Sequence, residues 1–159
     1  MIKSKKEVAM AKLSGLDACD KSRLWLARQK SIEHAWKNLK NFGWLSWLLS
    51  HTTSLRKKAI AKTKKIFTQA LKEMYPRCAK AINTLARSKD PTGLALEVEQ
   101  ALQRGGYAID SQYVYYLVSA YEDLVLNYFD DTLTSRIERS APALNDTTLL
   151  KTLKAEIPA

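Results

Sequence analysis

Apolar residues recur at steps of three, four and seven along most of the chain, and this is the spacing of one buried stripe on an amphipathic helix. Five Gly and four Pro leave little turn material for a many-stranded sheet. The pattern therefore predicts an all-α fold, a single compact domain of about five to seven helices. In chain order the apolar stripes are Trp25, Ile32, Trp36 and Leu39; Ile60, Phe67, Leu71 and Met74; Cys78, Ile82 and Leu85; Leu94, Val98 and Ala101; Val114, Leu117, Tyr121, Leu124 and Tyr128; and Leu149, Leu150 and Leu153.

Residues that favour helix starts and stops predict where these helices begin and end. The first helix runs from Ser22 and is bent or ended by Gly43. A new helix starts at about Ser54, after a cluster of residues that cap helices well. Pro76 lacks a backbone donor and restricts the residue before it, so a kink or a fresh helix start is expected there.

The segment 88–93 is the clearest break in the chain. Asp90 can cap the helix that follows, and Pro91 can occupy its first position. Gly105 and Gly106 then close that helix. The remaining starts and interruptions are expected at Asp110 or Ser111, which begin the long central helix, at Asp130 to Thr132, and at Asn145 or Asp146.

The charge of the chain changes sign at this break. The 159 residues carry a formal net charge of +10. Residues 1–90 hold 21 Lys and Arg against six Asp and Glu, whereas residues 91–159 hold five against ten. We expect a single domain over residues 1–159, because neither part alone presents enough apolar faces to fold independently. In this domain a basic helical subregion, 1–89, packs on an acidic, Tyr-rich subregion, 91–159, through the joint at 88–93.

The basic residues fall on the predicted helices at spacings that share a face. Like charges at these spacings repel one another, and few acidic residues lie between them, so an external anion is expected to neutralise them. Phosphates do this without reading sequence. We therefore predict a non-catalytic protein that binds RNA or DNA through backbone contacts, as a small subunit or accessory factor of a nucleoprotein complex. The predicted contact residues are Arg23, Lys30, Lys37, Lys58, Lys62, Lys65, Lys72, Arg77, Lys80 and Arg87.

Two other interpretations of the basic residues stay open at this point. They form solvated faces that keep the chain soluble, or they pair with the acidic subregion of the same molecule or of another copy. Binding to a lipid surface is less favoured, because the basic residues extend from Arg23 to Arg87, which suits a long polymer better than a plane of headgroups.

A different set of residues favours a protein-interaction module, such as an adaptor, inhibitor or effector. The segment 42–49 is apolar in every direction, so it is either buried on all sides or a contact surface. Trp25 and Trp36 fit the buried stripe of the first helix, whereas the Trp residues of the segment do not. The predicted partner surface consists of Trp44, Trp47, Glu122, Asp123, Asp130 and Asp131.

Signals for catalysis are few. The chain has no Gly-rich phosphate loop, no GxSxG and no HExxH. The stretch RQKSIEH places Arg28 and His34 at a spacing that resembles that of the helical HEPN ribonucleases. The resemblance implies metal-independent RNA cleavage by a dimer with these two residues facing the scissile phosphate, although Gln29 stands where that family has a different polar residue. We interpret His34 as a surface histidine beside the basic residues, and we predict no catalytic residue.

No metal, cofactor or small-molecule substrate is expected. Cys19 and Cys78 lie 59 residues apart and show no ligand spacing. The N-terminal MIKSKKEVAMAKL is basic but lacks the continuous apolar stretch of a signal peptide, so a cytoplasmic location is expected. The longest apolar stretch, Trp44 to Leu49, is far shorter than the ~20 residues that a membrane-spanning helix needs.

Overall fold

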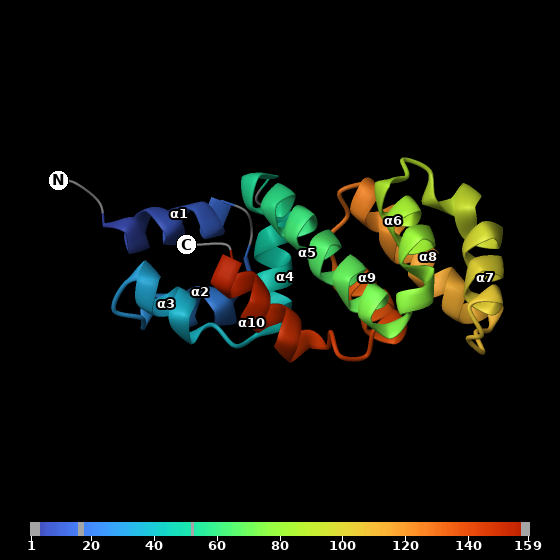
Figure 1. Ribbon diagram of the computed structural model, residues 1–159. Coiled ribbons are helices and arrows are strands. Elements are labelled where there is room, and N and C mark those ends of the chain that lie inside the picture. Colours follow the sequence, from blue (N-terminus) through green and yellow to red (C-terminus); the bar gives the residue numbers. More distant parts are fainter. Residues whose placement is uncertain (1–3, 16–17, 52, 157–159) are drawn as a thin grey trace.

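The computed structural model describes residues 4–15, 18–51 and 53–156, and the secondary structure of these ranges is entirely helical. The prediction of an all-α fold is confirmed. The predicted number of five to seven helices is too low, because the described ranges contain ten α-helices and two short 3-10 helices (Figure 1). They are α1 (Lys5–Gly15), α2 (Asp20–Ala27), α3 (Ile32–Asn38), α4 (Phe42–His51), α5 (Thr53–Met74), η1 (Pro76–Cys78), α6 (Ala79–Arg87), η2 (Pro91–Leu94), α7 (Ala95–Arg104), α8 (Ser111–Val125), α9 (Asp131–Ser140) and α10 (Asp146–Glu156).

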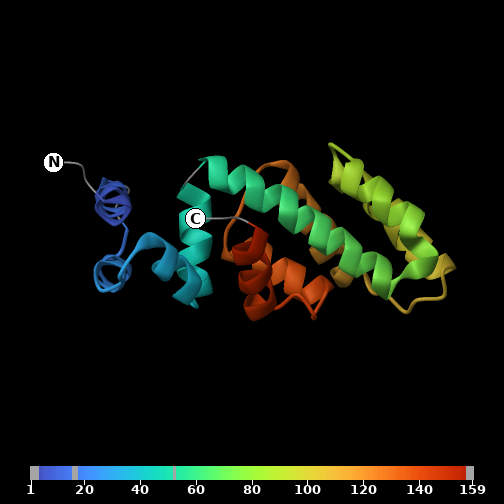
Figure 2. The same cartoon turned by 60° about the vertical axis from the view of Figure 1, so that its left-hand side comes forward.

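Helix α5 is the longest element and runs through the middle of the molecule (Figure 1). Its first half packs beside α4 and α10, and its second half packs against α6 and α8. Figure 2 shows α5 and α6 as the two arms of a hairpin that turns at η1. Pro76 occupies the start of η1, as the sequence predicts for a kink or fresh start.

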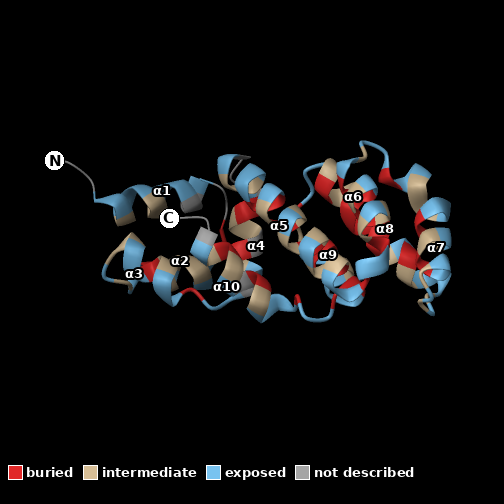
Figure 3. Ribbon diagram, in the orientation of Figure 1, coloured by how far each residue is buried: buried red, intermediate tan, exposed pale blue. Residues whose placement is uncertain are grey.

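The core follows these packed helices (Figure 3). Around α4, α5 and α10 the fully buried side chains include Leu45, Leu49 and Leu153. Around α5, α8 and α9, the ring of Phe67 lies 5.1 Å from that of Tyr121. Apolar side chains from helices far apart in the sequence thus share one continuous cluster, which also includes Leu71, Ile82, Leu85, Leu102, Leu117, Leu133 and Ile137.

Helices α1 to α3 form the end of the molecule that is opposite α7 (Figure 1). A ring contact and several hydrogen bonds join them to the rest. The rings of Trp25 in α2 and Trp44 in α4 lie 5.7 Å apart. The Trp36 indole Nε1 of α3 donates to the Lys154 carbonyl of α10 at 3.1 Å. Lys154 Nζ in turn donates to the carbonyls of Lys37, at 2.9 Å, and Leu39, at 2.7 Å.

The single helix predicted from Ser22 to Gly43 is wrong, because the structure divides it. Helix α2 ends at Ala27, and Ser31 begins a new helix by accepting a hydrogen bond from the His34 backbone N–H at 3.1 Å. Gly43 does not end a helix. It lies in the first turn of α4, which Asn41 caps through a bond from the Trp44 backbone N–H.

The later helix starts agree with the sequence. Asp90, Asp110 and Asp130 each accept a hydrogen bond from the backbone N–H three residues on, and Asn145 does the same for α10. These side chains satisfy donors that a helix N-terminus leaves without partners.

Helices α7 and α8 end in the same way. In α7, Gly106 takes a left-handed backbone with φ of 86°, and in α8 Asn127 does so with φ of 58°. In both, the next residue donates its N–H five residues back, a Schellman ending. Because α8 stops there, Tyr128 is 60% exposed. The prediction that Tyr128 belongs to the buried stripe of this helix is therefore wrong. Met74, the last residue of α5, is also exposed rather than buried.

Candidate nucleic-acid interface

The outer face of α5 carries the densest positive charge on any single helix of the described chain. The helix contains seven Lys and Arg and one acidic residue, Glu73. Its core side is formed by residues such as Ala59, Thr63 and Phe67, all buried. Five lysines lie outside this core side, over a broad face of the helix, and are exposed or half-buried. We call these residues the lysine face: Lys57, Lys58, Lys64, Lys65 and Lys72.

Nothing in the described part of the chain neutralises the lysine face. None of its five side chains forms a hydrogen bond or an ion pair with another described residue. Glu73 accepts a hydrogen bond from Gln69 at 3.2 Å. Other pairs, Lys5 with Glu33 and Arg136 with Asp123, join residues within the same subregion.

The dimensions of the lysine face suit a polyanion. At about 1.5 Å of rise per residue, the fifteen steps from Lys57 to Lys72 span about 22 Å. A duplex strand places one phosphate about every 3.4 Å along its axis, so this length matches roughly six phosphates.

Four of the predicted contact residues lie on α5; three of them belong to the lysine face, and the fourth, Lys62, does not. Lys58, Lys65 and Lys72 are members. Lys62 lies at the edge of the face, is half-buried, and has a contact within the chain. Sequence reasoning missed Lys57 and Lys64, which are seven residues apart and so lie together along one border of the face.

Helix α6 carries two more of the predicted contact residues, Lys80 and Arg87, which are exposed and two turns apart. Arg77 in η1 has a structural role, because its guanidinium Nη1 donates to the Gly105 carbonyl at 3.1 Å. This bond satisfies a carbonyl at the C-terminal end of α7, where a cation is favourable.

The three basic residues of the first predicted helix do not form one stripe. Arg23 of α2 is paired with Asp20, Lys30 lies in the bend between α2 and α3, and Lys37 lies on α3. The seven-residue register that aligned them requires an unbroken helix, and the break at residues 28–31 removes it.

The predicted protein-contact residues fall into two groups. Trp44 packs on Trp25. Glu122 accepts a hydrogen bond from Thr92 at 3.1 Å. Asp123 is paired with Arg136; burial raises the pKa of Asp123, while the guanidinium acts in the opposite direction. These three side chains therefore have contacts within the chain.

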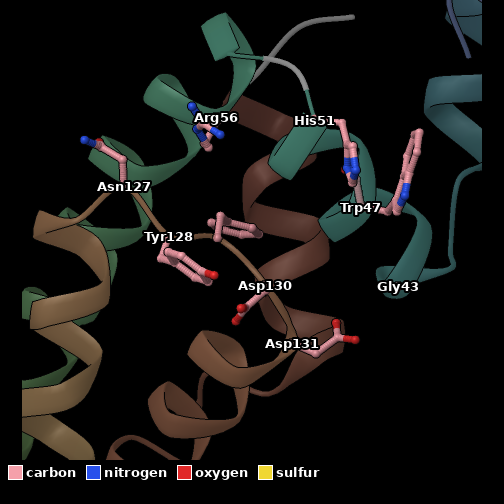
Figure 4. A pocket seen from close by; sticks show the side chains of 9 residues that line it. Gly43, Trp47, His51, Arg56, Asn127, Tyr128, Asp130 and Asp131 are labelled. Atoms are coloured by element: carbon pink, nitrogen blue, oxygen red, sulfur yellow. The ribbon is translucent and has the colours of Figure 1, made fainter. Parts of the chain in front are cut away.

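The other three line one cavity of about 550 Å³. They are Trp47 from α4 and Asp130 and Asp131 from the start of α9 (Figure 4). The sequence does not predict that these residues lie close together, because more than 80 residues separate the two segments. The complete lining is Gly43, Trp47, His51, Arg56, Asn127, Tyr128, Phe129, Asp130 and Asp131.

Arg28 and His34, which carry the resemblance to HEPN ribonucleases, lie on either side of the α2–α3 bend and are both exposed. The backbone of His34 takes part in the cap of α3. No contact described for these two side chains brings them together.

Comparison with protein-family models, curated proteins and solved structures found no match for this chain. Within the described ranges, none of the helices combines the length and the apolar character needed to cross a bilayer.

Proposed function

We propose that this protein binds nucleic acid through phosphate contacts along the lysine face, with little sequence preference, as a non-catalytic accessory factor. The observation that carries the proposal is the row of five lysines on one side of α5 that have no partner among the described residues. Each lysine that displaces a condensed counterion adds affinity without reading a base.

The proposal is tested by fluorescence anisotropy with labelled single- and double-stranded RNA and DNA of about 30 nucleotides over a salt series. Five phosphate contacts give a slope of log K against log salt of about −4.5 on duplex DNA and about −3.5 on single strands. A shallow slope with weak binding would overturn the proposal and favour the protein-interaction module.

A pair of variants assigns the binding to α5. Lys58→Gln/Lys65→Gln/Lys72→Gln removes three charges from the lysine face and is expected to make the duplex slope shallower by about 2.7. The control, Lys12→Gln/Lys21→Gln/Lys151→Gln, removes the same charge from exposed positions on α1, α2 and α10. Equal loss in both variants would show that net charge, rather than this face, determines binding. Far-ultraviolet circular dichroism verifies that both stay helical.

A further inference from the structure

The cavity between α4, α5 and the α8–α9 loop is built from residues that the phosphate contacts do not use. Its aromatic side chains are Trp47, His51, Tyr128 and Phe129. Its volume of about 550 Å³ lies in the usual range for small-ligand sites. Tyr128 is 60% exposed, so much of this residue is open to a ligand.

Several groups around the cavity are held in place before any ligand arrives. The rings of Trp47 and His51 are stacked, with centroids 4.2 Å apart, and His51 Nδ1 lies 2.8 Å from the Trp47 carbonyl oxygen. Asp130 accepts a hydrogen bond from the Leu133 backbone N–H at 3.0 Å. The Schellman ending of α8 fixes the backbone of Asn127.

The charges of the lining narrow the class of ligand. Arg56 supplies a cation, while Asp130 and Asp131 supply two carboxylates. A purely anionic ligand would meet the carboxylates, and a purely cationic ligand would meet the guanidinium. A neutral, flat ring with donors and acceptors along its edge is repelled neither by the carboxylates nor by the guanidinium. In Figure 4 Arg56 and Asn127 lie on one side of Tyr128, and the two aspartates lie on the other.

We propose that this cavity binds a nucleobase that stacks on Tyr128. The carboxylates of Asp130 and Asp131 accept from its exocyclic amino or ring N–H groups. Stacking on an aromatic side chain tolerates every base, because each base has a π-face.

The base comes from a free nucleoside or from a nucleic-acid strand. The second source rests on the proposed function. Arg56 in the cavity lies seven residues before the buried Thr63 and so on the core side of α5, whereas the lysine face begins at Lys57. A strand whose phosphates follow the lysine face therefore reaches the cavity by turning around the N-terminal end of α5.

The test uses the four ribonucleosides, which carry no phosphate and so do not engage the lysine face. The ¹⁵N-labelled protein is titrated with each, and the backbone amides of residues 127–131 and the Trp47 indole are followed. Saturable shifts at these positions are expected with at least one nucleoside. Tyr128→Ala is expected to weaken the affinity at least about fivefold. Tyr115→Ala is the matched control, since Tyr115 is 59% exposed and lies outside the cavity.

Two further arms separate this inference from the proposed function. The lysine-face triple variant is expected to bind nucleosides as the wild type does, and Tyr128→Ala is expected to weaken single-stranded oligonucleotides more than duplexes. If the protein bound nucleosides but not oligonucleotides, the nucleobase site in the cavity would stand and the proposed function would be overturned. If no nucleoside caused shifts, and Tyr128→Ala bound oligonucleotides as the wild type does, the proposal of a nucleobase site would be overturned. The proposal of phosphate contacts along the lysine face would stand. If an oligo-arginine peptide shifted the amides of residues 127–131 and none of the four nucleosides did, the nucleobase site would also be overturned, in favour of a basic protein partner.

Discussion

Replacing Lys154 by methionine tests the joint between α3 and α10. Lys154 Nζ donates to the carbonyls of Lys37 and Leu39, at 2.9 and 2.7 Å. The Lys37 carbonyl belongs to the last turn of α3, whose carbonyls have no partner within that helix, and Leu39 is the residue that follows α3. Methionine keeps the apolar length of the side chain and removes only the charged donor.

The loss is estimated from these two bonds. Hydrogen bonds from a charged donor contribute about 1.5–3 kcal/mol each, and the lower figure applies because Lys154 is only half-buried. Lys154→Met is therefore expected to lower the free energy of unfolding by about 3 kcal/mol. With a urea m-value near 2 kcal/mol/M, the midpoint falls by about 1.5 M.

Urea unfolding is followed by circular dichroism and by tryptophan fluorescence, because Trp36 lies at the same joint. Lys151→Met is the control: Lys151 lies one turn earlier on α10 and is exposed. It is expected to change the stability by less than about 0.5 kcal/mol. If Lys154→Met and Lys151→Met had the same urea midpoint by both signals, the two bonds from Lys154 to the carbonyls would contribute nothing to stability and the reasoning would fail.

Three other substitutions have expected outcomes. The Thr63 hydroxyl is buried and has no hydrogen-bond partner among the described residues, so Thr63→Val is expected to stabilise the protein by about 1 kcal/mol, a rise in Tm of about 2–4 °C by calorimetry. An unchanged or lower Tm would contradict this. Gly105→Ala places a Cβ 2.8 Å from Cys78 Sγ and is expected to cost about 1–2 kcal/mol in urea unfolding. That cost should shrink in a Cys78→Ala background, and strict additivity would refute the clash. Hydrogen bonds with Ser22 lower the pKa of the Cys19 thiol, so the midpoint of its alkylation rate against pH should rise in Ser22→Ala; an unmoved midpoint would exclude this cause.

The all-α fold and the later helix boundaries could be predicted because they rest on local chemistry. Asp90, Asp110 and Asn145 cap helices as expected, since one side chain near its own backbone determines each start. The break at 28–31 was missed because it contains neither Gly nor Pro, and Ser31 was its only signal. The exposure of Tyr128 was missed because the helical period was continued beyond Asn127, which ends α8.

The candidate sites divide in the same way. The lysine face could be predicted in part, since all its members lie on one helix, but the sequence pattern included Lys62 and left out Lys57 and Lys64. The cavity could not be predicted, because its lining depends on how α4 meets the α8–α9 loop, and this is decided by packing between distant segments.

The position of α10 also has a consequence for synthesis. Leu45 and Leu49 of α4 are fully buried, and α10 packs on that helix. Ribosomes add about 5–20 residues per second, so α10 follows α4 from the ribosome after roughly 5–20 s. During that interval the nascent chain exposes the side of α4 that α10 covers in the folded protein, while α5 can already pack on it. The packing around α4 is therefore complete only after α10 has been synthesised, and the apolar side chains that α10 covers are open to aggregation until then.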